Sequence, residues 1–420
     1  MQAAIIAIGD EILIGRTQDS NSHYLARMLH LAGIPVGHMQ VIADEKPLIR
    51  KALARALETA HLVIFTGGLG PTSDDITKLA LAGFFGQEAL TVHQPTLERM
   101  RAWYASRGRE LNPRSARMAE VPANCQPLDN PVGAAPGLLW EQEGRHVVAL
   151  PGVPHEMRAI FEQQVLPVIE TEMGAFVVQQ EIFRLVGVPE SKLSELLSGV
   201  EQSLPPEIKI AYNPNLGLLD LRVVLQCASE DEGRLRPPFE QALQEIRSIV
   251  RPYHYGDANT TLEEAVGQLL KAHGASLATA ESCTGGHIAG RIVRIPGSSE
   301  YLQGGVIAYS NQVKMQQLGV RRQSLEEHGA VSEQVACEMA RGVREALGTT
   351  LGVATTGVAG PGGGSDEKPV GLVYIGLATP EGVEARPFQF EKNRWRNIQR
   401  SVTTALHLVW KYLRQQPSAA

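Results

Sequence analysis

Small nucleophilic side chains gather in one short stretch of the C-terminal half, TAESCTGGHIAGRI. Ser282, Cys283 and Thr284 stand directly before the paired glycines Gly285 and Gly286. The run ASLATA ahead of them is typical of a strand, and a helix is predicted to begin after the glycines. Because glycines let the backbone turn tightly, we expect their amide groups to face an anion or a developing oxyanion. The stretch therefore predicts a nucleophile at the mouth of a glycine turn.

A nucleophilic serine needs a base within hydrogen-bond reach. For Ser282 the candidate base is Lys314, in AYSNQVK, because burial would lower the pKa of its amine into a working range. Tyr309 in the same stretch would relay a proton or hold the lysine in place. Serine–lysine pairs are a known alternative to the serine–histidine–aspartate triad. We therefore predict that Ser282, Tyr309 and Lys314 form the catalytic group.

Two further polar loops are expected beside this turn. PGSSEY contains Ser299, and TTGVAGPGGG, after the predicted strand LGVA, contains Thr356 and several glycines. Ligands of open α/β sheets bind where strands end in such turns. The residues predicted to contact a substrate are therefore Thr284, Gly285, Gly286, Ser299, Thr356, Gly357 and Gly360.

Two other readings of these residues stay open. Cys283 would be the nucleophile if the start of a helix lowered the pKa of its thiol; otherwise it is a small buried hydrophobic residue. A tyrosine followed by a lysine also occurs in short-chain reductases. Those enzymes need YxxxK and a GxGxxG turn, whereas this chain has YxxxxK and no GxGxxG after a predicted strand.

The front half contains a second glycine-rich loop, FTGGLGPTSDD, after the predicted strand HLVIFTGG. Its hydroxyls and carboxylates are expected either to cap the next helix or to hold a nucleotide. Asp10 and Glu11, in IGDEILIG, end the first predicted strand and would converge on the same sheet edge, where carboxylates suit a divalent cation that bridges phosphates. The predicted nucleotide contacts are Thr66, Gly67, Gly68, Gly70, Thr72 and Asp74, and the predicted metal ligands are Asp75, Glu11 and Asp10.

The elements that must position these residues alternate between strand and helix patterns. Residues 1–170 follow a βαβαβ rhythm, which predicts a mostly parallel sheet covered by helices. Residues 171–256 follow a β-α-β-β-α order and have no obvious catalytic cluster. Residues 257–420 open with a helix capped by Thr261 and repeat the α/β pattern. The predicted fold is α/β, with two independent three-layer α/β domains joined by a small α+β connector domain.

Composition narrows the class of protein. The chain has 420 residues, 20% of them charged, and a net charge of −6, which argues against a nucleic-acid partner. Its four cysteines lie far apart with no CxxC pair, so a reducing cytoplasm is expected and a structural zinc site is not. The apolar start MQAAIIAIGDEILIG is predicted to be a buried strand rather than a signal peptide, and no membrane partner is expected.

The C-terminal motifs, taken in order, resemble the nicotinamide mononucleotide amidohydrolase domain of the CinA family. They are TAESCTGG, PGSS, AYSNQVK and TTGVAGPGGG followed by KPVG. The resemblance covers residues 258–410 and implies hydrolysis of nicotinamide mononucleotide (NMN) to nicotinic acid mononucleotide and ammonia, without a metal. It also implies that Arg394 contacts the substrate, although the family usually has glycine and aspartate before this arginine and this chain has FEKNR.

The front half resembles the molybdopterin-binding (MoaB/MogA-like) domain of the same family, through IGDEILIG, FTGGLGPTSDD, NPVGAAPG and LPGVPHEM. This resemblance implies a nucleotide-like ligand at 66–75 and hydrolysis of ADP-ribose to AMP and ribose 5-phosphate with Mg, Mn or Co. Glu156 would add a carboxylate. The family resemblance further implies a homodimer. The alternative is a non-catalytic pterin- or nucleotide-binding module that acts in competence or DNA-damage responses.

Overall fold

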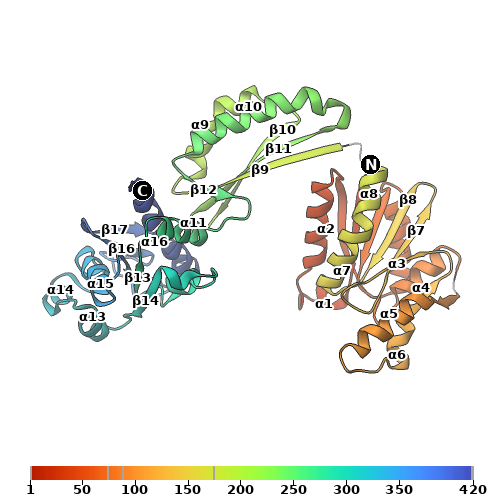
Figure 1. Cartoon of the computed structure of the whole chain (residues 1–420), viewed down its shortest axis with the longest axis horizontal. Coiled ribbons are helices and arrows are strands. Elements are labelled where there is room, and N and C mark those ends of the chain that lie inside the picture. The colour runs from red at the N-terminus through yellow and green to blue at the C-terminus, as the bar shows by residue number, and fades with distance from the viewer. Residues whose placement is uncertain (1, 73–74, 88, 174–175, 418–420) are drawn as a thin grey trace. The chain divides into compact units, whose positions relative to one another are not determined.

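The computed structural model describes residues 2–72, 75–87, 89–173 and 176–417 (Figure 1). The chain divides into two compact units. One comprises Met1–Gln179 with Leu225–Arg236, and the other comprises Gln180–Val224 with Pro237–Ala420.

The first unit is built on a six-stranded sheet with the order β2-β1-β3-β8-β7-β6. β2, β1, β3 and β8 are parallel, while β7 and β6 are antiparallel to their neighbours. A separate antiparallel pair is formed by β4 and β5. The strands are β1 Ala3–Ile8, β2 Val36–Ile42, β3 Leu62–Thr66, β4 Leu90–Val92, β5 Glu120–Pro122, β6 Gln126–Leu128, β7 Gly137–Gln142 and β8 Arg145–Leu150.

Helices cover both faces of this sheet. Every residue of β1 is buried, and alternate residues point to opposite faces: Ile6 packs in one core cluster and Ile5 in the other. Leu53 joins the first cluster and Leu25 the second, so the domain has three layers. The helices are α1 Asp10–Leu13, α2 Ser20–Leu31, α3 Lys46–Leu57, α4 Thr77–Phe84, α5 Gln94–Ala105, α6 Pro113–Ala116, α7 Pro154–Ile160 and α8 Leu166–Met173.

The middle of the chain forms a four-stranded sheet with the order β10-β11-β9-β12. Along β11 buried residues alternate with half-buried ones, as expected for a sheet with one face on a core. The elements are β9 Phe176–Val186, α9 Glu190–Ser203, β10 Ile208–Asn215, β11 Leu218–Ala228, α10 Glu232–Val250 and β12 His254–Asp257. Residues 171–256 thus contribute to both compact units, and the predicted boundaries at 170 and 256 stay predictions.

The C-terminal part contains a five-stranded sheet with the order β14-β13-β15-β16-β17. β14, β13 and β15 are parallel, whereas β16 and β17 are antiparallel. Its strands are β13 Leu277–Glu281, β14 Leu302–Ile307, β15 Leu351–Gly357, β16 Leu372–Thr379 and β17 Gly382–Gln389. Its helices are α11 Leu262–Ala272, α12 His287–Ile292, α13 Asn311–Leu318, α14 Arg322–His328, α15 Glu333–Ala346 and α16 Arg394–Gln415.

This sheet too lies between two helical layers. Ala280 of β13 packs in a cluster with Met339 of α15, whereas Leu277 of the same strand packs with Leu270 of α11 and Leu406 of α16. Thr261 caps α11 as predicted, because its side chain accepts a hydrogen bond from the amide of Glu264. In register, Glu281 lies opposite Ile307 and Thr355, so the residues that follow β13, β14 and β15 meet at one edge of the sheet.

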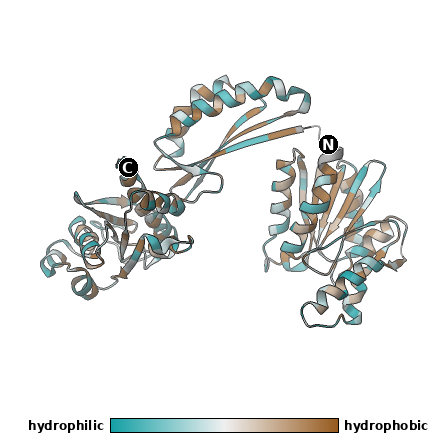
Figure 2. Ribbon diagram, viewed as in Figure 1, coloured by the Kyte–Doolittle hydropathy of each residue, from teal (hydrophilic) through white to brown (hydrophobic). Residues whose placement is uncertain are grey.

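The predicted α/β class with three-layer domains is confirmed. Figure 2 shows that many helices carry hydrophobic residues along one side and hydrophilic residues along the other, as helices that pack on a sheet do. Within the described ranges, no helix combines the length and the apolar character needed to cross a membrane.

Candidate active site

Ser282 and Lys314 lie side by side in the C-terminal part of the chain. Lys314 Nζ is 3.0 Å from Ser282 Oγ. Ser282 follows β13 directly, and its amide donates to the carbonyl of Thr355 on the neighbouring strand. Lys314 comes from α13, whose start is capped by the side chain of Ser310. The two predicted residues are therefore brought together from distant parts of the sequence by rigid elements.

The surroundings of Lys314 favour an uncharged amine. Its side chain is almost fully buried, and burial lowers its pKa below the ordinary value of 10.5. Besides Ser282 Oγ, Nζ contacts the carbonyl oxygens of Ala308 at 2.7 Å and Tyr309 at 3.3 Å. Carbonyls can only accept, so they use two N–H groups of the amine. A neutral amine then has its lone pair directed at the hydroxyl of Ser282, which is the arrangement that a general base requires.

The alternative nucleophile, Cys283, is protonated in this environment. Its side chain is buried, and desolvation raises the pKa of its thiol to about 12. The expectation that a helix start would lower this pKa is therefore wrong, because burial outweighs it. Cys283 instead packs in the hydrophobic core of this part of the chain.

The amides of the glycine turn are already occupied. The buried carboxylate of Glu281 accepts hydrogen bonds from the amides of Gly286, Ile288 and Ala289 at 2.9–3.0 Å. The amide of Gly285 donates to the carbonyl of Ser282. The prediction that the amides of Gly285 and Gly286 are free to face a bound anion or a developing oxyanion is therefore wrong, because a side-chain carboxylate and a backbone carbonyl of the chain itself already accept from them. Glu281 uses the amides that begin α12 to hold the turn that carries Ser282.

Threonines at the same sheet edge also have internal partners. Thr284 Oγ1 and Thr355 Oγ1 are 2.7 Å apart, and both side chains are buried. Thr356 Oγ1 donates to the carbonyl of Ala330 at 2.7 Å. Thr356 and Gly357 end β15 next to Ser282, as predicted, but the hydroxyl of Thr356 positions a neighbouring loop. A Cβ on Gly357 would lie 2.6 Å from the carbonyl of Leu372, so the close strand pairing requires glycine here.

Tyr309 and Arg394 form an exposed pair beside Lys314. Arg394 Nη2 donates to Tyr309 Oη at 3.3 Å, and Nη1 donates to the carbonyl of Gly360 at 2.7 Å. Because Tyr309 Oη accepts from the guanidinium, its own hydrogen stays available for another acceptor. Arg394 thus joins the predicted group despite the unusual FEKNR sequence before it.

Ser299 lies at the other end of the sheet. The turn that contains it precedes β14, whereas Ser282 follows β13, and the two strands are parallel. Five residues of β13 separate the two edges, which corresponds to roughly 15 Å. The prediction that Ser299 contacts a substrate at Ser282 is therefore not supported within one chain, because the PGSS loop opens a strand rather than ending one.

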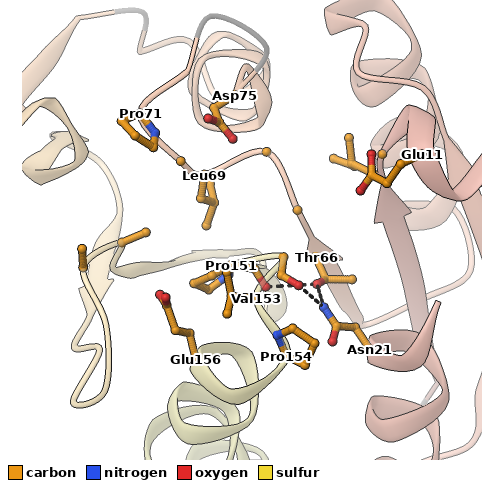
Figure 3. A pocket seen from close by; sticks show the side chains of 18 of the residues that line it. Glu11, Asn21, Thr66, Leu69, Pro71, Asp75, Pro151, Val153, Pro154 and Glu156 are labelled. Carbon is orange, nitrogen blue, oxygen red and sulfur yellow. Dashed lines mark hydrogen bonds between the residues drawn. The ribbon is translucent and has the colours of Figure 1, made fainter. Parts of the chain in front are cut away.

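A second candidate site is a cavity of about 640 Å³ in the first unit (Figure 3). Thr66, at the end of β3, donates to the carbonyl of Pro151 and accepts from Asn21 Nδ2 at 2.9 Å. Asn21 Nδ2 also donates to the carbonyl of Gly152, while the buried Asn21 Oδ1 has no hydrogen-bond partner in the described structure. Asn21 was not predicted, because QDSNSHYL carries no signal beyond that of a helix start.

The predicted glycine loop lines this cavity. Gly67 has φ 111°, and a Cβ there would lie 2.3 Å from the carbonyl of Ile8. Gly68 and Gly70 follow it in the wall of the cavity. Thr72 donates through its amide to Asp75 Oδ2 at 2.7 Å, so these two residues bind each other rather than capping α4, whose N-cap is Ile76. Asp74 lies outside the described residues.

The carboxylates around the cavity lie on different walls. Figure 3 shows Glu11, Asp75 and Glu156 apart from one another, and Asp10 is exposed and does not line the cavity. Asp44, which was not predicted, also lines it. Burial and the nearby carboxylates of Asp10 and Glu11 raise the pKa of Asp44. In the described part of the chain, no three His, Cys, Asp or Glu side chains gather in a way that could hold a metal ion.

Comparisons with known proteins follow this division of the chain. The family described as "CinA C-terminal domain" matches residues 259–413, and the family described as "Probable molybdopterin binding domain" matches residues 4–171. The chain is similar to a CinA-like protein of Salinibacter ruber, with 41% identity over 97% of this chain and 98% of that protein.

Solved structures resemble single parts of the chain. A CinA protein with unknown function from Thermoplasma acidophilum is 37% identical, covers 41% of this chain and 97% of its own, and gives a TM-score of 0.37. A competence/damage inducible protein of Agrobacterium tumefaciens is 38% identical, covers 37% of this chain and 98% of its own, and gives a TM-score of 0.35.

Proposed function

The chain belongs to the CinA family, and from this premise we propose that its C-terminal part hydrolyses the carboxamide of NMN to nicotinic acid mononucleotide and ammonia. The observation that carries the proposal is the contact of 3.0 Å between Lys314 Nζ and Ser282 Oγ. A serine in contact with a buried lysine whose pKa is lowered by burial is the pair of groups that an amide hydrolase needs to work without a metal.

In the first half-reaction Ser282 Oγ attacks the carboxamide carbon while Lys314 Nζ takes the hydroxyl proton. Two carbonyls hold the amine in place, so it does not have to reorganise when it gains the proton. A carbon–oxygen bond forms, and the resulting tetrahedral intermediate carries its negative charge on the former carbonyl oxygen. Arg394 and the hydroxyl of Tyr309 supply donors on the exposed side of the pair.

Departure of ammonia breaks the carbon–nitrogen bond and needs one proton. The protonated Lys314 supplies it, directly or through the hydroxyl of Tyr309, and returns to its neutral form. In the second half-reaction Lys314 takes a proton from a water molecule, and the water oxygen attacks the acyl carbon of the acyl-serine. The bond between that carbon and Ser282 Oγ breaks, Lys314 returns the proton to Ser282, and the carboxylate product leaves. No step needs an oxidant, a reductant or a second substrate besides water.

The test is release of ammonia from NMN by the full chain. Wild-type protein should release one ammonia for each nicotinic acid mononucleotide formed, and Ser282→Ala should release none above the uncatalysed rate. If wild-type protein releases no ammonia, the chain is better described as a non-catalytic nucleotide- or pterin-binding module, which is the main alternative. Equal rates for wild type and Ser282→Ala would remove the serine from the mechanism.

For the front domain we propose binding of a nucleotide diphosphate and hydrolysis of ADP-ribose to AMP and ribose 5-phosphate. The observation in favour is the cavity of about 640 Å³, which is large enough for a nucleotide and combines a glycine loop with the unpartnered acceptor of Asn21. The separated carboxylates do not form a ligand set for Mg, Mn or Co in this structure, so we assign no reaction step to a metal. Measuring AMP produced from ADP-ribose tests the proposal.

A further inference from the structure

Three large hydrophobic side chains stay exposed close to the buried Ser282–Lys314 pair. They are Ile307 at the end of β14, Tyr309 two residues later, and Trp395 in the first turn of α16, with exposures of 57%, 65% and 59%. Because more than half of each of these side chains is exposed, the indole and the phenol are available to contact a ligand. Tyr309 already contacts Arg394 and belongs to the site described above, whereas Trp395 has no role there.

Trp395 is tied to the turn that carries Ser282. Its ring meets the imidazole of His287 edge to face, with centroids 5.5 Å apart and an interplanar angle of 75°. His287 opens α12, and its Nδ1 donates to the carbonyl of Thr284 within the turn. Because a carbonyl only accepts, this bond fixes the orientation of the imidazole. Trp395 therefore rests on a side chain that is itself held by the turn.

The backbone of Trp395 is fixed as well. Its neighbour Arg394 is bound to the carbonyl of Gly360 and to Tyr309 Oη. The side chain of Asn393 caps α16 by accepting from the amide of Arg396 at 3.0 Å. An exposed ring on such a fixed support loses little conformational entropy when a ligand stacks on it.

We propose that Trp395, supported by His287, stacks on the positively charged pyridine ring of the substrate and so selects for that ring. The inference rests on the proposed amidase function. The carboxamide of the substrate must reach Ser282 Oγ, and its ring then lies beside the turn from which His287 projects. Among aromatic side chains, the indole of tryptophan attracts a ring with a quaternary nitrogen most strongly. An uncharged amide of similar size gains much less from this contact.

The experiment measures binding without turnover. In the Ser282→Ala background, the Kd for NMN is compared with the Kd after adding Trp395→Ala or Trp395→Phe, by titration calorimetry. We expect Trp395→Ala to weaken binding about tenfold and Trp395→Phe to retain much of the affinity, because phenylalanine keeps an aromatic face. Leu196→Ala, which removes an exposed hydrophobic side chain from α9, serves as the matched control and should leave the Kd unchanged.

A second probe separates ring charge from simple hydrophobic contact. Reduced NMN has an uncharged dihydropyridine ring, so Trp395→Ala should weaken its binding much less than that of NMN.

In the otherwise unchanged enzyme, Trp395→Ala should raise KM about tenfold while kcat stays within about twofold, as expected for a group that binds ground state and transition state alike.

Three results would overturn the inference. Binding of NMN that is unchanged in Trp395→Ala would leave the amidase proposal intact and exclude the stacking contact. An equal loss for oxidised and reduced NMN would show that ring charge is not recognised. A shift of Trp395→Ala from dimer to monomer with unchanged affinity would assign the exposed indole to contact with a second copy of the chain. If the Ser282→Ala protein with Trp395 intact does not bind NMN, and wild type releases no ammonia, the proposed function fails and this inference with it.

Discussion

Lys314 Nζ lies 3.0 Å from Ser282 Oγ, and each of the three hydrogen bonds recorded for this amine ends on an uncharged oxygen. A charged lysine would be expected to pair with a carboxylate when it is this deeply buried. The buried carboxylate of Glu281, the residue before Ser282, accepts instead from the amides of Gly286, Ile288 and Ala289. The two groups therefore act separately: Lys314 contacts the hydroxyl of Ser282, and Glu281 stabilises the turn that carries it.

Two serines from the predicted set should behave in opposite ways. Ser282→Ala removes the nucleophile, so kcat for ammonia release from NMN should fall by about 10³-fold or more. Ser299→Ala changes an exposed residue at the opposite sheet edge and should leave kcat and KM within about twofold of wild type. Steady-state ammonia assays on both variants check this. A large loss in Ser299→Ala would show that a loop from the far edge, or from a second subunit, reaches the substrate.

The amidase should depend on the unprotonated form of Lys314. Burial lowers the pKa of this lysine, so kcat/KM should rise with pH as the amine loses its proton and reach a plateau at higher pH. The apparent pKa of this rise should lie below 10.5. Lys314→Arg keeps a positive charge that cannot be lost, and its activity should fall about 10³-fold at every pH. A pH–rate profile from pH 5 to about 10.5 measures both. If Lys314→Arg kept a rising limb with the same midpoint, another group would be the base.

Glu281→Ala should destabilise the C-terminal part of the chain. The substitution leaves three backbone amides without their carboxylate, each worth about 1 kcal/mol or more when buried and unpaired, so a total loss of about 3 kcal/mol is expected. Glu281→Gln should lose less stability, because the amide oxygen of glutamine can still accept hydrogen bonds from these backbone amides. Urea unfolding followed by circular dichroism measures the free energy of unfolding.

The control for this substitution is Glu326→Ala, an exposed glutamate on α14 that should change stability by no more than about 0.5 kcal/mol. Equal stabilities for Glu281→Ala and Glu326→Ala would mean that water replaces the carboxylate without cost. Fully folded Glu281→Ala protein should in addition release ammonia more slowly, since the turn under Ser282 is no longer held.

The two proposed activities should separate cleanly. Asp75→Ala should abolish production of AMP from ADP-ribose and leave ammonia release from NMN unchanged, because Asp75 lines the cavity of the first unit and Ser282 lies in the second. EDTA should leave ammonia release from NMN unchanged, because no step of the proposed amidase mechanism uses a metal. Loss of both activities in Asp75→Ala would indicate general misfolding, which circular dichroism would reveal.

Residues near one another in sequence were well predicted. Short, mostly apolar runs predicted the strands β1, β3 and β13, and the cap at Thr261 was predicted from the residues beside it. The partnership of Ser282 with Lys314 could also be predicted, because both follow strands that turned out to be parallel neighbours, β13 and β14, whose ends share one sheet edge. The types of the two side chains and the positions of the predicted strands were together enough to predict that this serine and this lysine meet.

Other features depended on contacts that no local pattern reports. A glycine turn predicts free amides, but the side chain of Glu281 folds back over five to eight positions to use them. Asn21 and Asp44 reach the front cavity from separate elements, and nothing in their neighbourhoods distinguishes them from surface residues. The separation of Glu11 from Asp75 likewise depends on where helix α1 and the loop between β3 and α4 lie around the cavity (Figure 3).

The sequence by itself determined the class of fold, the order of the elements and the kinds of side chain at the ends of the strands. These follow from periodicity and turn residues, which act within a few positions of the chain. Only the tertiary structure decided that Ser299 lies at the opposite edge from Ser282, that Cys283 is buried as a thiol, and that Trp395 stays exposed against His287. Burial, strand direction and the distance between loops are properties of the packed chain, because they arise from residues that are far apart in sequence.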